Sequence, residues 1–310
     1  MNDLSELHEA STPSSRMRDE IRRTSDASRA RRMTVSRIMI LLCGLALAVS
    51  AVPLVALIYE LLRLGVPVID KTFFTTLPAT PTLIAPNATG GVSNAIIGTL
   101  VLTLYASVMA IPLGVLVGVY LSESDSKLAA ALRVISQTMA GAPSILMGLF
   151  AFSFIVHDLN VGFSAIAGAF ALAVLMMPVI IISTEIAVRG VPNTLREAGL
   201  ALGAKPHKVS LRIVLPAAIS GIVTGSILAV SRAVGETAPV LLTIGGGFIN
   251  SWKPLDPVSA LPLTIFENAK SEWPSQRAQV WGIALVLVAF VFVLSLSARI
   301  WAARKQRVNN

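Results

Sequence analysis

The stretch REAGLALGAKPHKVSLRIVLP, residues 196–216, is a long polar interruption between two apolar runs in the second half of the chain. Thr194 and Glu197 have capping-box spacing, which predicts a helix that begins there, with Glu197 bonded back to the cap. Gly203 suits the position just after that helix, and Pro206 suits the first turn of a second short helix. The stretch therefore predicts a compact helix–turn–helix, called the hairpin below.

The rest of the chain is too apolar for a water-soluble globular domain. Of its 310 residues, 54% are hydrophobic and 14% are charged, and the mean hydropathy is +0.74, whereas a soluble domain has about 25% charged residues. Several runs reach the roughly 20 apolar residues that a helix needs to cross a bilayer. The sequence predicts an all-α polytopic membrane protein with six transmembrane helices. These spans are expected at about 38–62, 94–121, 132–156, 164–186, 217–247 and 280–302.

The spans divide the chain into four parts. Residues 1–36 are an Arg/Ser-rich tail without apolar periodicity, which we expect to be largely disordered. Residues 37–91 contain the first span and an external loop, and residues 92–302 contain the other five spans. The loop that holds the hairpin is placed at 187–216, and residues 303–310 form a basic end.

The distribution of Lys and Arg predicts the orientation. When Arg133 and Arg299, near the ends of their spans, are counted with the adjoining segments, 19 of the 25 basic residues lie on one side and 5 on the other, and Arg232 lies within a span. Cytoplasmic loops carry the excess of basic residues in membrane proteins. Both termini and the hairpin are therefore expected in the cytoplasm. The basic tail has no aromatic residues, which disfavours a nucleic-acid partner and leaves the lipid bilayer as the expected contact.

Two charged residues fall within the fifth expected span. Arg232 would lie about 22 Å along a helix that begins at Ala217, with Glu236 one turn further on. A charge at that depth costs several kcal/mol, so each should face a cavity or a partner. One interpretation is a structural ion pair between spans. The other assigns Arg232, Glu236, Ser231 and Thr237 to a substrate pathway, where the Arg232 guanidinium would meet a tetrahedral oxyanion.

Glycine and proline residues mark expected bends and close helix contacts. Gly235 and Pro239 would let the fifth span bend around Arg232, and Pro143 interrupts the third span. Such breaks are tolerated where neighbouring protein or a cavity satisfies the backbone. The pairs with small-xxx-small spacing, which suits close helix packing, are Gly114 with Gly118 and Gly221 with Gly225.

The hairpin resembles the EAA loop of ABC importer permeases, which docks into a groove on a separate ATPase subunit. The matching order is E-A, a glycine five residues after the alanine, and I-x-L-P further on. One departure is Gly199, where the family usually has alanine; we expect it to weaken the helix by about 1 kcal/mol. The resemblance assigns these residues to ATPase coupling: Glu197, Ala198, Gly199, Gly203, Leu215 and Pro216.

Three other strings resemble the phosphate-specific branch of these permeases, and specifically its A-type subunit. They are S-R-A-x-G-E-T-A-P at 231–239, G-A-P-S-I-x-x-G-L-F at 141–150 and G-G-x-x-N-A-I-x-G-T at 90–99. The likeness covers about residues 88–302. In that branch the Arg and Glu of the first string matter for phosphate passage.

The resemblance implies a type I ABC importer permease fold of the MetI-like kind, in a bacterial inner membrane. It implies three kinds of partner: a second, similar permease subunit as a heterodimer, an ATPase dimer and an external phosphate-binding protein. The chain itself has no G-x-x-x-x-G-K-[ST] loop and no metal-ligand motif, so we expect no cofactor on it. ATP and Mg²⁺ belong on the partner ATPase, and the chain is not expected to be an enzyme.

Several alternatives remain open at this point. The same class of permease could carry sulfate or molybdate instead of phosphate. The chain could be the partner permease of the phosphate system, although Ser231 and the Ala238-Pro239 pair favour the A subunit. A self-contained secondary carrier would not need the asymmetric hairpin. An intramembrane enzyme would need a nucleophile–base pair on facing spans, and none is evident.

Overall fold

The computed structural model describes residues 13–309, with side chains described for residues 32–297, 299 and 300. Within residues 13–309 every regular element is a helix, and β-type pairing is limited to two isolated bridges, Pro78 with Gly90 and Gly245 with Val258. The all-α prediction is confirmed for this part of the chain. The chain divides into two compact units, Met1–Glu60 and Leu61–Asn310.

The first unit contains one long helix. Helix α1 (Pro13–Gly65) has 53 residues, and its segment 32–65, with the short 3₁₀ turn η2 (Val66–Val68), is apolar enough to cross a membrane. The prediction of a disordered tail is therefore wrong for residues 13–36, whereas residues 1–12 lie outside the described residues. The physical reason is that Arg, Ala, Met and Glu are good helix formers, and an existing helix extends without a new nucleation cost.

Among the described residues, five helices are long and apolar enough to cross a membrane, or six if a bent pair counts as one span. The bent pair is α4 (Lys127–Ala140) with residues 144–158, and the helix direction changes by 107° between them. The break falls at Gly141–Pro143, as the sequence predicted. The five unbent candidate spans are Arg32–Val68, Ser93–Glu123, Ala165–Arg189, Pro206–Val234 and Pro274–Ser297.

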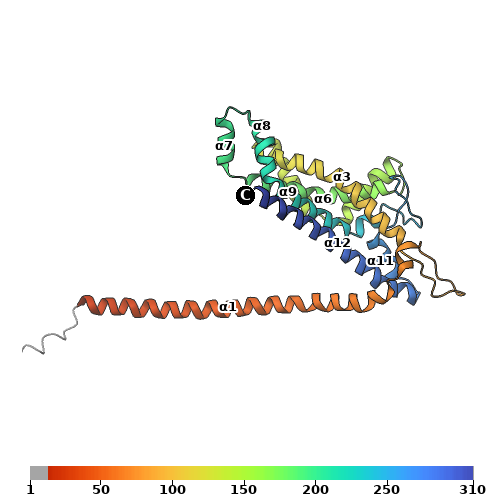
Figure 1. The fold of residues 1–310 in the computed structure, drawn as a ribbon, viewed down its shortest axis with the longest axis horizontal. Coiled ribbons are helices and arrows are strands. Elements are labelled where there is room, and N and C mark those ends of the chain that lie inside the picture. The colour runs from red at the N-terminus through yellow and green to blue at the C-terminus, as the bar shows by residue number, and fades with distance from the viewer. Residues whose placement is uncertain (1–12, 310) are drawn as a thin grey trace, which may run out of the picture. The chain divides into compact units, whose positions relative to one another are not determined.

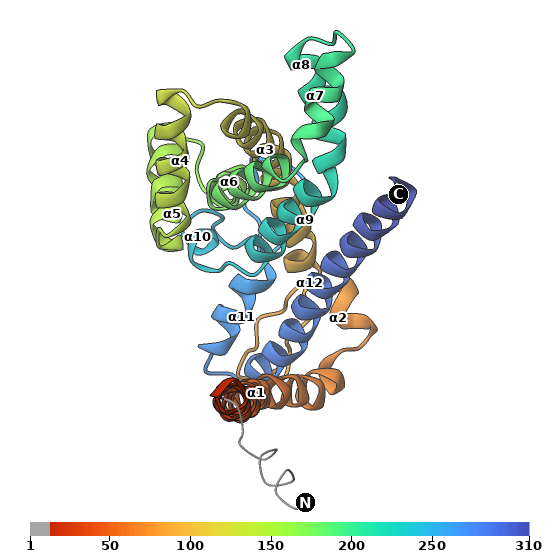
Figure 2. The same cartoon turned by 90° about the vertical axis from the view of Figure 1, so that its left-hand side faces the viewer.

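Three helices form the centre of the second unit (Figures 1 and 2): α3 (Ser93–Glu123), α6 (Ala165–Arg189) and α9 (Leu215–Val234). Glycines allow α6 to pack closely on both neighbours. A Cβ at Gly114 of α3 would lie 2.7 Å from Ile180 of α6, and one at Gly221 of α9 would lie 2.7 Å from Ala187. Gly118 and Gly225 also lie against α6. Both predicted small-residue pairs are confirmed as close contacts.

The remaining helices pack around this centre. Figure 2 shows α12 (Pro274–Asn309) beside α9, and α4 with α5 (Ser144–Ala151) on the other side of α6. The hairpin projects from one end of the unit, and α11 (Leu261–Ala269) lies at the opposite end in both views. The other elements are α2 (Lys71–Thr75), η3 (Phe152–Asp158), α7 (Asn193–Ala201), α8 (Pro206–Val209), η4 (Ser210–Val214) and α10 (Ala238–Leu241).

The fifth predicted span has wrong boundaries. Its helix is continuous from Pro206 to Val234, so it begins inside the hairpin and ends 13 residues before the predicted end at Gly247. Gly235 terminates α9, and after Thr237 the four-residue α10 is all that follows before a loop. Glycine and proline at 235 and 239 favour such a break. Arg232 consequently lies in the last turn of the span helix.

Candidate functional site

The hairpin consists of α7, a turn, and α8 continued by the π-helical segment η4. Gly203 in the turn has φ of +78°, and Pro206 occupies the first turn of α8, as predicted. The second arm is not a separate short helix, because η4 joins it directly to α9. The hairpin is therefore rigidly continuous with a membrane span.

The predicted capping box does not form. Helix α7 begins at Asn193, and its N-cap is Pro192, with no side-chain cap bond. The extended backbone of Pro192, with ψ of 136°, starts the helix two residues earlier than predicted, so Thr194 is already helical and cannot cap. Glu197 is instead exposed, as is Ala198. The outer surface of the hairpin thus carries both residues that begin the EAA-like motif.

Gly199 packs closely against the second arm of the hairpin, a role that its low helix propensity alone did not predict. It is the one buried residue of α7, and a Cβ there would lie 2.8 Å from Ile213 Cδ1 and 3.0 Å from Val209 Cγ2. The missing methyl group therefore lets α7 approach the second arm closely. Behind that contact, an apolar cluster that includes Val188, Val209 and Val214 anchors the hairpin to α6 and α9.

A carboxylate at the end of α3 holds both arms of the hairpin. Glu123 forms an ion pair with Arg196 of α7 through Oε1, and its Oε2 accepts a hydrogen bond of 2.9 Å from Ser210 Oγ of η4. Arg196 also donates to the carbonyl oxygen of Val188 at 3.1 Å. This set, Glu123 with Arg196 and Ser210, is called the clamp below. It connects the hairpin to a helix far away in sequence.

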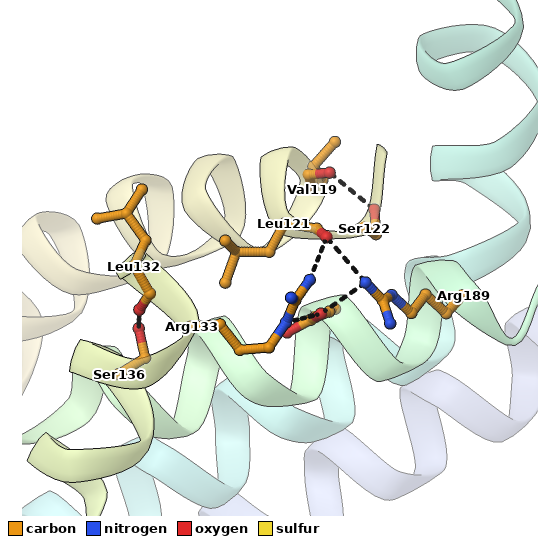
Figure 3. A network of polar contacts seen from close by, with 8 residues as sticks. Val119, Leu121, Ser122, Leu132, Arg133, Ser136 and Arg189 are labelled. Atoms are coloured by element: carbon orange, nitrogen blue, oxygen red, sulfur yellow. Dashed lines mark hydrogen bonds and ion pairs between the residues drawn. The ribbon is translucent and has the colours of Figure 1, made fainter. Parts of the chain in front are cut away.

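A second polar network joins α3, α4 and α6 at the same end (Figure 3). Arg133 and Arg189 both donate to the carbonyl oxygen of Leu121, at 3.0 and 3.2 Å. Both also pair with the buried carboxylate of Glu185, at 2.9 and 3.1 Å to Oε1. Glu185 and Arg189 are four residues apart on α6, one helical turn. Local spacing could not predict that Arg133 pairs with Glu185, because the two residues are 52 positions apart in the chain.

Arg232 and Glu236 lie where α9 ends. The distance from Arg232 Nε to Glu236 Oε1 is 3.5 Å, and the Arg232 side chain is 49% exposed. This contact is long for a hydrogen bond, and no other partner of the guanidinium occurs among residues with described side chains. The pair is therefore loose, and most of the Arg232 donors remain available to a ligand or a partner subunit.

The other predicted pathway residues do not gather around Arg232. The hydroxyl of Ser231 lies 2.9 Å from that of Ser295 on α12, so it points to a different neighbour. Thr237 is the N-cap position of α10 and is half-buried, with no side-chain cap bond. Gly235 is the exposed C-cap of α9. The structure thus brings together only Arg232 and Glu236 as a charged pair.

Two of the three strings that resemble the phosphate-specific branch, 141–150 and 231–239, contact each other. Gly148 of α5 packs on Pro239 of α10, because a Cβ at Gly148 would lie 2.5 Å from Pro239 Cα. Pro143 is the N-cap of α5. The string at 141–150 therefore supports the segment that follows Glu236.

The third string, residues 90–99, lies at the end of the unit opposite the hairpin. Asn94 donates to the carbonyl oxygen of Gly247 at 2.7 Å, and Thr99 Oγ1 accepts from Leu261 N at 2.9 Å. Beside these bonds lies a cavity of about 390 Å³ that includes Glu267 of α11. Burial raises the pKa of Glu267 above its ordinary value of 4.5. Among the described residues, no group of three or more His, Cys, Asp or Glu side chains could hold a metal ion.

An exposed hairpin at one end of a helical bundle, with a charged pair at the far end of the helix that leaves it, defines a transmembrane permease subunit. Residues 110–307 match the family described as "Binding-protein-dependent transport system inner membrane component". The chain belongs to this family, and its curated relatives place it in the PstA branch.

The relatives match over most of the chain. PstA of Haemophilus influenzae is 35% identical over 89% of this chain and 96% of its own length, and PstA 1 of Mycobacterium tuberculosis is 40% identical over 71% and 73%. Each carries the description phosphate transport system permease protein. Among solved structures, the inward-facing MetNI methionine ABC transporter aligns with a TM-score of 0.56 at 20% identity, over 68% of this chain and 94% of that one. That likeness confirms the MetI-like fold.

Proposed function

We propose that this chain is the transmembrane permease subunit of an ATP-driven importer of inorganic phosphate. The observation that carries the proposal is Arg232, a half-exposed guanidinium on a span helix with one loose contact to Glu236. A guanidinium presents a planar fork of donors that matches a tetrahedral oxyanion. The identity to PstA proteins supports phosphate as that oxyanion.

The hairpin couples the permease to a separate ATPase. Its tip exposes Leu195, Ala198 and Leu202, the last with 89% of its surface exposed. Exposed apolar side chains of this size mark a protein interface. An ATPase dimer of the PstB kind takes this surface into a groove, binds ATP and Mg²⁺ itself, and leaves this chain without a cofactor.

The remaining partners complete the path of the anion. A PstC-like permease forms a heterodimer with this chain and covers the exposed face of α9. A PstS-like binding protein delivers phosphate to the external residues 63–91 and 248–278. Both termini and the hairpin lie in the cytoplasm, in agreement with the excess of Lys and Arg on that side. Nucleotide-driven closure of the ATPase moves the hairpin, and the spans alternate between outward and inward access.

Uptake of labelled phosphate tests the proposal. Cells that lack the gene receive wild type, Arg232→Ala or Arg232→Lys, with matched abundance in the membrane. We expect wild type to restore uptake at low external phosphate, Arg232→Ala to fail, and Arg232→Lys to restore part of it. Equal uptake with all three variants would make the Arg232–Glu236 pair structural.

Substrate and energy source are tested separately. If sulfate or molybdate uptake depends on this chain while phosphate uptake does not, the phosphate assignment is wrong. If uptake persists after the ATPase gene is deleted, the chain is a secondary carrier and the coupling role of the hairpin is wrong.

A further inference from the structure

A small cavity lies between α9 and α12, and neither Arg232 nor Glu236 lines it. Its volume is about 130 Å³, whereas one water molecule needs about 10–15 Å³ by the same measure. The cavity is therefore large enough for a small polyatomic ligand. Its lining residues are Thr224, Ile227, Leu228, Ser231, Ser295 and Arg299.

The hydroxyl groups in this cavity have one spare donor. The Oγ atoms of Ser231 and Ser295 lie 2.9 Å apart, so one hydroxyl donates to the other. That bond consumes one of their two hydrogens and leaves the second free to point into the cavity. Thr224 already donates to the carbonyl oxygen of Ser220 at 2.7 Å and adds no donor. The cavity thus offers a hydroxyl pair with one donor to spare.

The charge in this cavity is uncompensated. Arg299 brings a guanidinium to the lining, and neither α9 nor α12 contains an Asp or Glu residue. Among residues with described side chains, Arg299 forms no ion pair. Arg299 is exposed and lies two residues beyond the candidate span Pro274–Ser297, so its guanidinium is accessible to an anion.

We propose that this cavity binds a tetrahedral phosphate-type oxyanion, with Arg299 as its charge partner and the Ser231–Ser295 pair as its hydrogen-bonding wall. The oxyanion is either free inorganic phosphate or the phosphodiester of an anionic lipid headgroup. Ser231 lines this cavity and directly precedes Arg232, but neither Arg232 nor Glu236 does, so the site adjoins the charged pair without including it. For free phosphate the inference rests on the proposed function and adds a second station to the path.

Two measurements on the purified whole transporter separate the two sources. The first is equilibrium binding of labelled inorganic phosphate, without nucleotide or binding protein, in nanodiscs of pure phosphatidylcholine. An Arg232→Ala background removes the other station. The second is native mass spectrometry of the transporter from vesicles of equal phosphatidylglycerol and phosphatidylcholine, which counts retained phosphatidylglycerol.

Three variants and one control make the test specific. We expect Arg299→Gln to lower bound phosphate at least fivefold in the first measurement, or to lose retained phosphatidylglycerol in the second. Arg299→Lys, which keeps the charge, should lose less, and Ser295→Ala should show an intermediate loss. Ser297→Ala is the control, because its hydroxyl bonds to the Leu294 carbonyl oxygen and it is absent from the cavity lining. It should match wild type.

The outcomes are separable from those of the proposed function. If Arg299→Gln matches wild type in both measurements, the site does not exist, even if uptake depends on this chain. If Arg299→Gln does not assemble, Arg299→Lys and Ser295→Ala decide the question in the same way. Loss of phosphatidylglycerol without any dependence of phosphate uptake on this chain would keep the site and overturn the proposed function.

Discussion

Replacing Gly148 by alanine tests the contact between α5 and the segment that follows the charged pair. The new Cβ would lie 2.5 Å from Pro239 Cα and 3.2 Å from Pro239 O, whereas ordinary contact begins at 3.4 Å. The two backbones must therefore separate by about 0.9 Å at the closest pair of atoms. Because the obstructing atoms belong to backbone, no change of rotamer can relieve the contact.

Two opposing contributions determine the expected change in the free energy of unfolding. Overpacking of this kind costs about 1–3 kcal/mol, and alanine in a helix gains about 1 kcal/mol over glycine. We expect a net loss of up to about 2 kcal/mol in the free energy of unfolding. The effect on transport should be larger, because α10 begins just after Glu236 and its displacement moves that carboxylate. Displacements near 1 Å at working groups cost up to about 10²-fold.

The assay is labelled phosphate uptake by cells with matched membrane abundance, together with thermal unfolding of the purified transporter. We expect Gly148→Ala to reduce uptake at least about tenfold. The control is Gly141→Ala in the same string, where the nearest atom to a new Cβ is the Thr138 carbonyl oxygen at 3.7 Å. Equal uptake by the two variants would refute the argument that this contact positions the charged pair.

Three further predictions concern single carboxylates. Glu123→Gln breaks the ion pair of the clamp, which is partly exposed and worth about 1 kcal/mol; we expect uptake to fall about fivefold with unchanged abundance, and wild-type uptake would contradict the clamp's role. Glu185→Gln leaves Arg133 and Arg189 without their shared charge, so the midpoint of thermal unfolding should fall by an amount equivalent to about 1–3 kcal/mol, and an unchanged midpoint would count against it. Burial raises the pKa of Glu267 in the folded protein. The contribution of this carboxyl group to the free energy of unfolding is therefore complete below 4.5, the pKa in the unfolded chain, and is lost as pH rises through the folded pKa. Glu267→Gln should therefore unfold at a higher temperature than wild type near pH 7, with the advantage disappearing near pH 4, and a pH-independent difference would show that the carboxyl does not titrate in this way.

Local spacing allowed much of the fold to be predicted. The expected spans at 94–121 and 164–186 differ from α3 and α6 by at most a few residues. The hairpin followed from one glycine and one proline at the correct separation. Hydropathy could not place the end of α9, because residues 238–247 remain apolar although Gly235 and Pro239 stop the helix. Composition likewise suggested disorder for residues 13–36, where helix propensity prevails.

The site was harder to predict, because its contacts join distant parts of the chain. Glu123 and Arg196 are 73 residues apart, and Ser231 and Ser295 are 64 apart. No single-sequence pattern encodes such pairs, whereas Arg232 with Glu236, one helical turn apart, is visible in the sequence. Glycine positions that allow close packing were predictable as pairs, but the residues they contact were not.

Because the helix is continuous from Pro206 to Val234, a rotation of the hairpin displaces the far end of this helix. At 1.5 Å per residue this helix is about 42 Å long, with the turn of the hairpin at one end and Arg232 near the other. A tilt of about 5° about one end would sweep the other by nearly 4 Å, by the same rise per residue. That displacement exceeds the length of a hydrogen bond. A rotation of a few degrees at the hairpin is therefore enough to form or break the contact with an anion that we propose for Arg232.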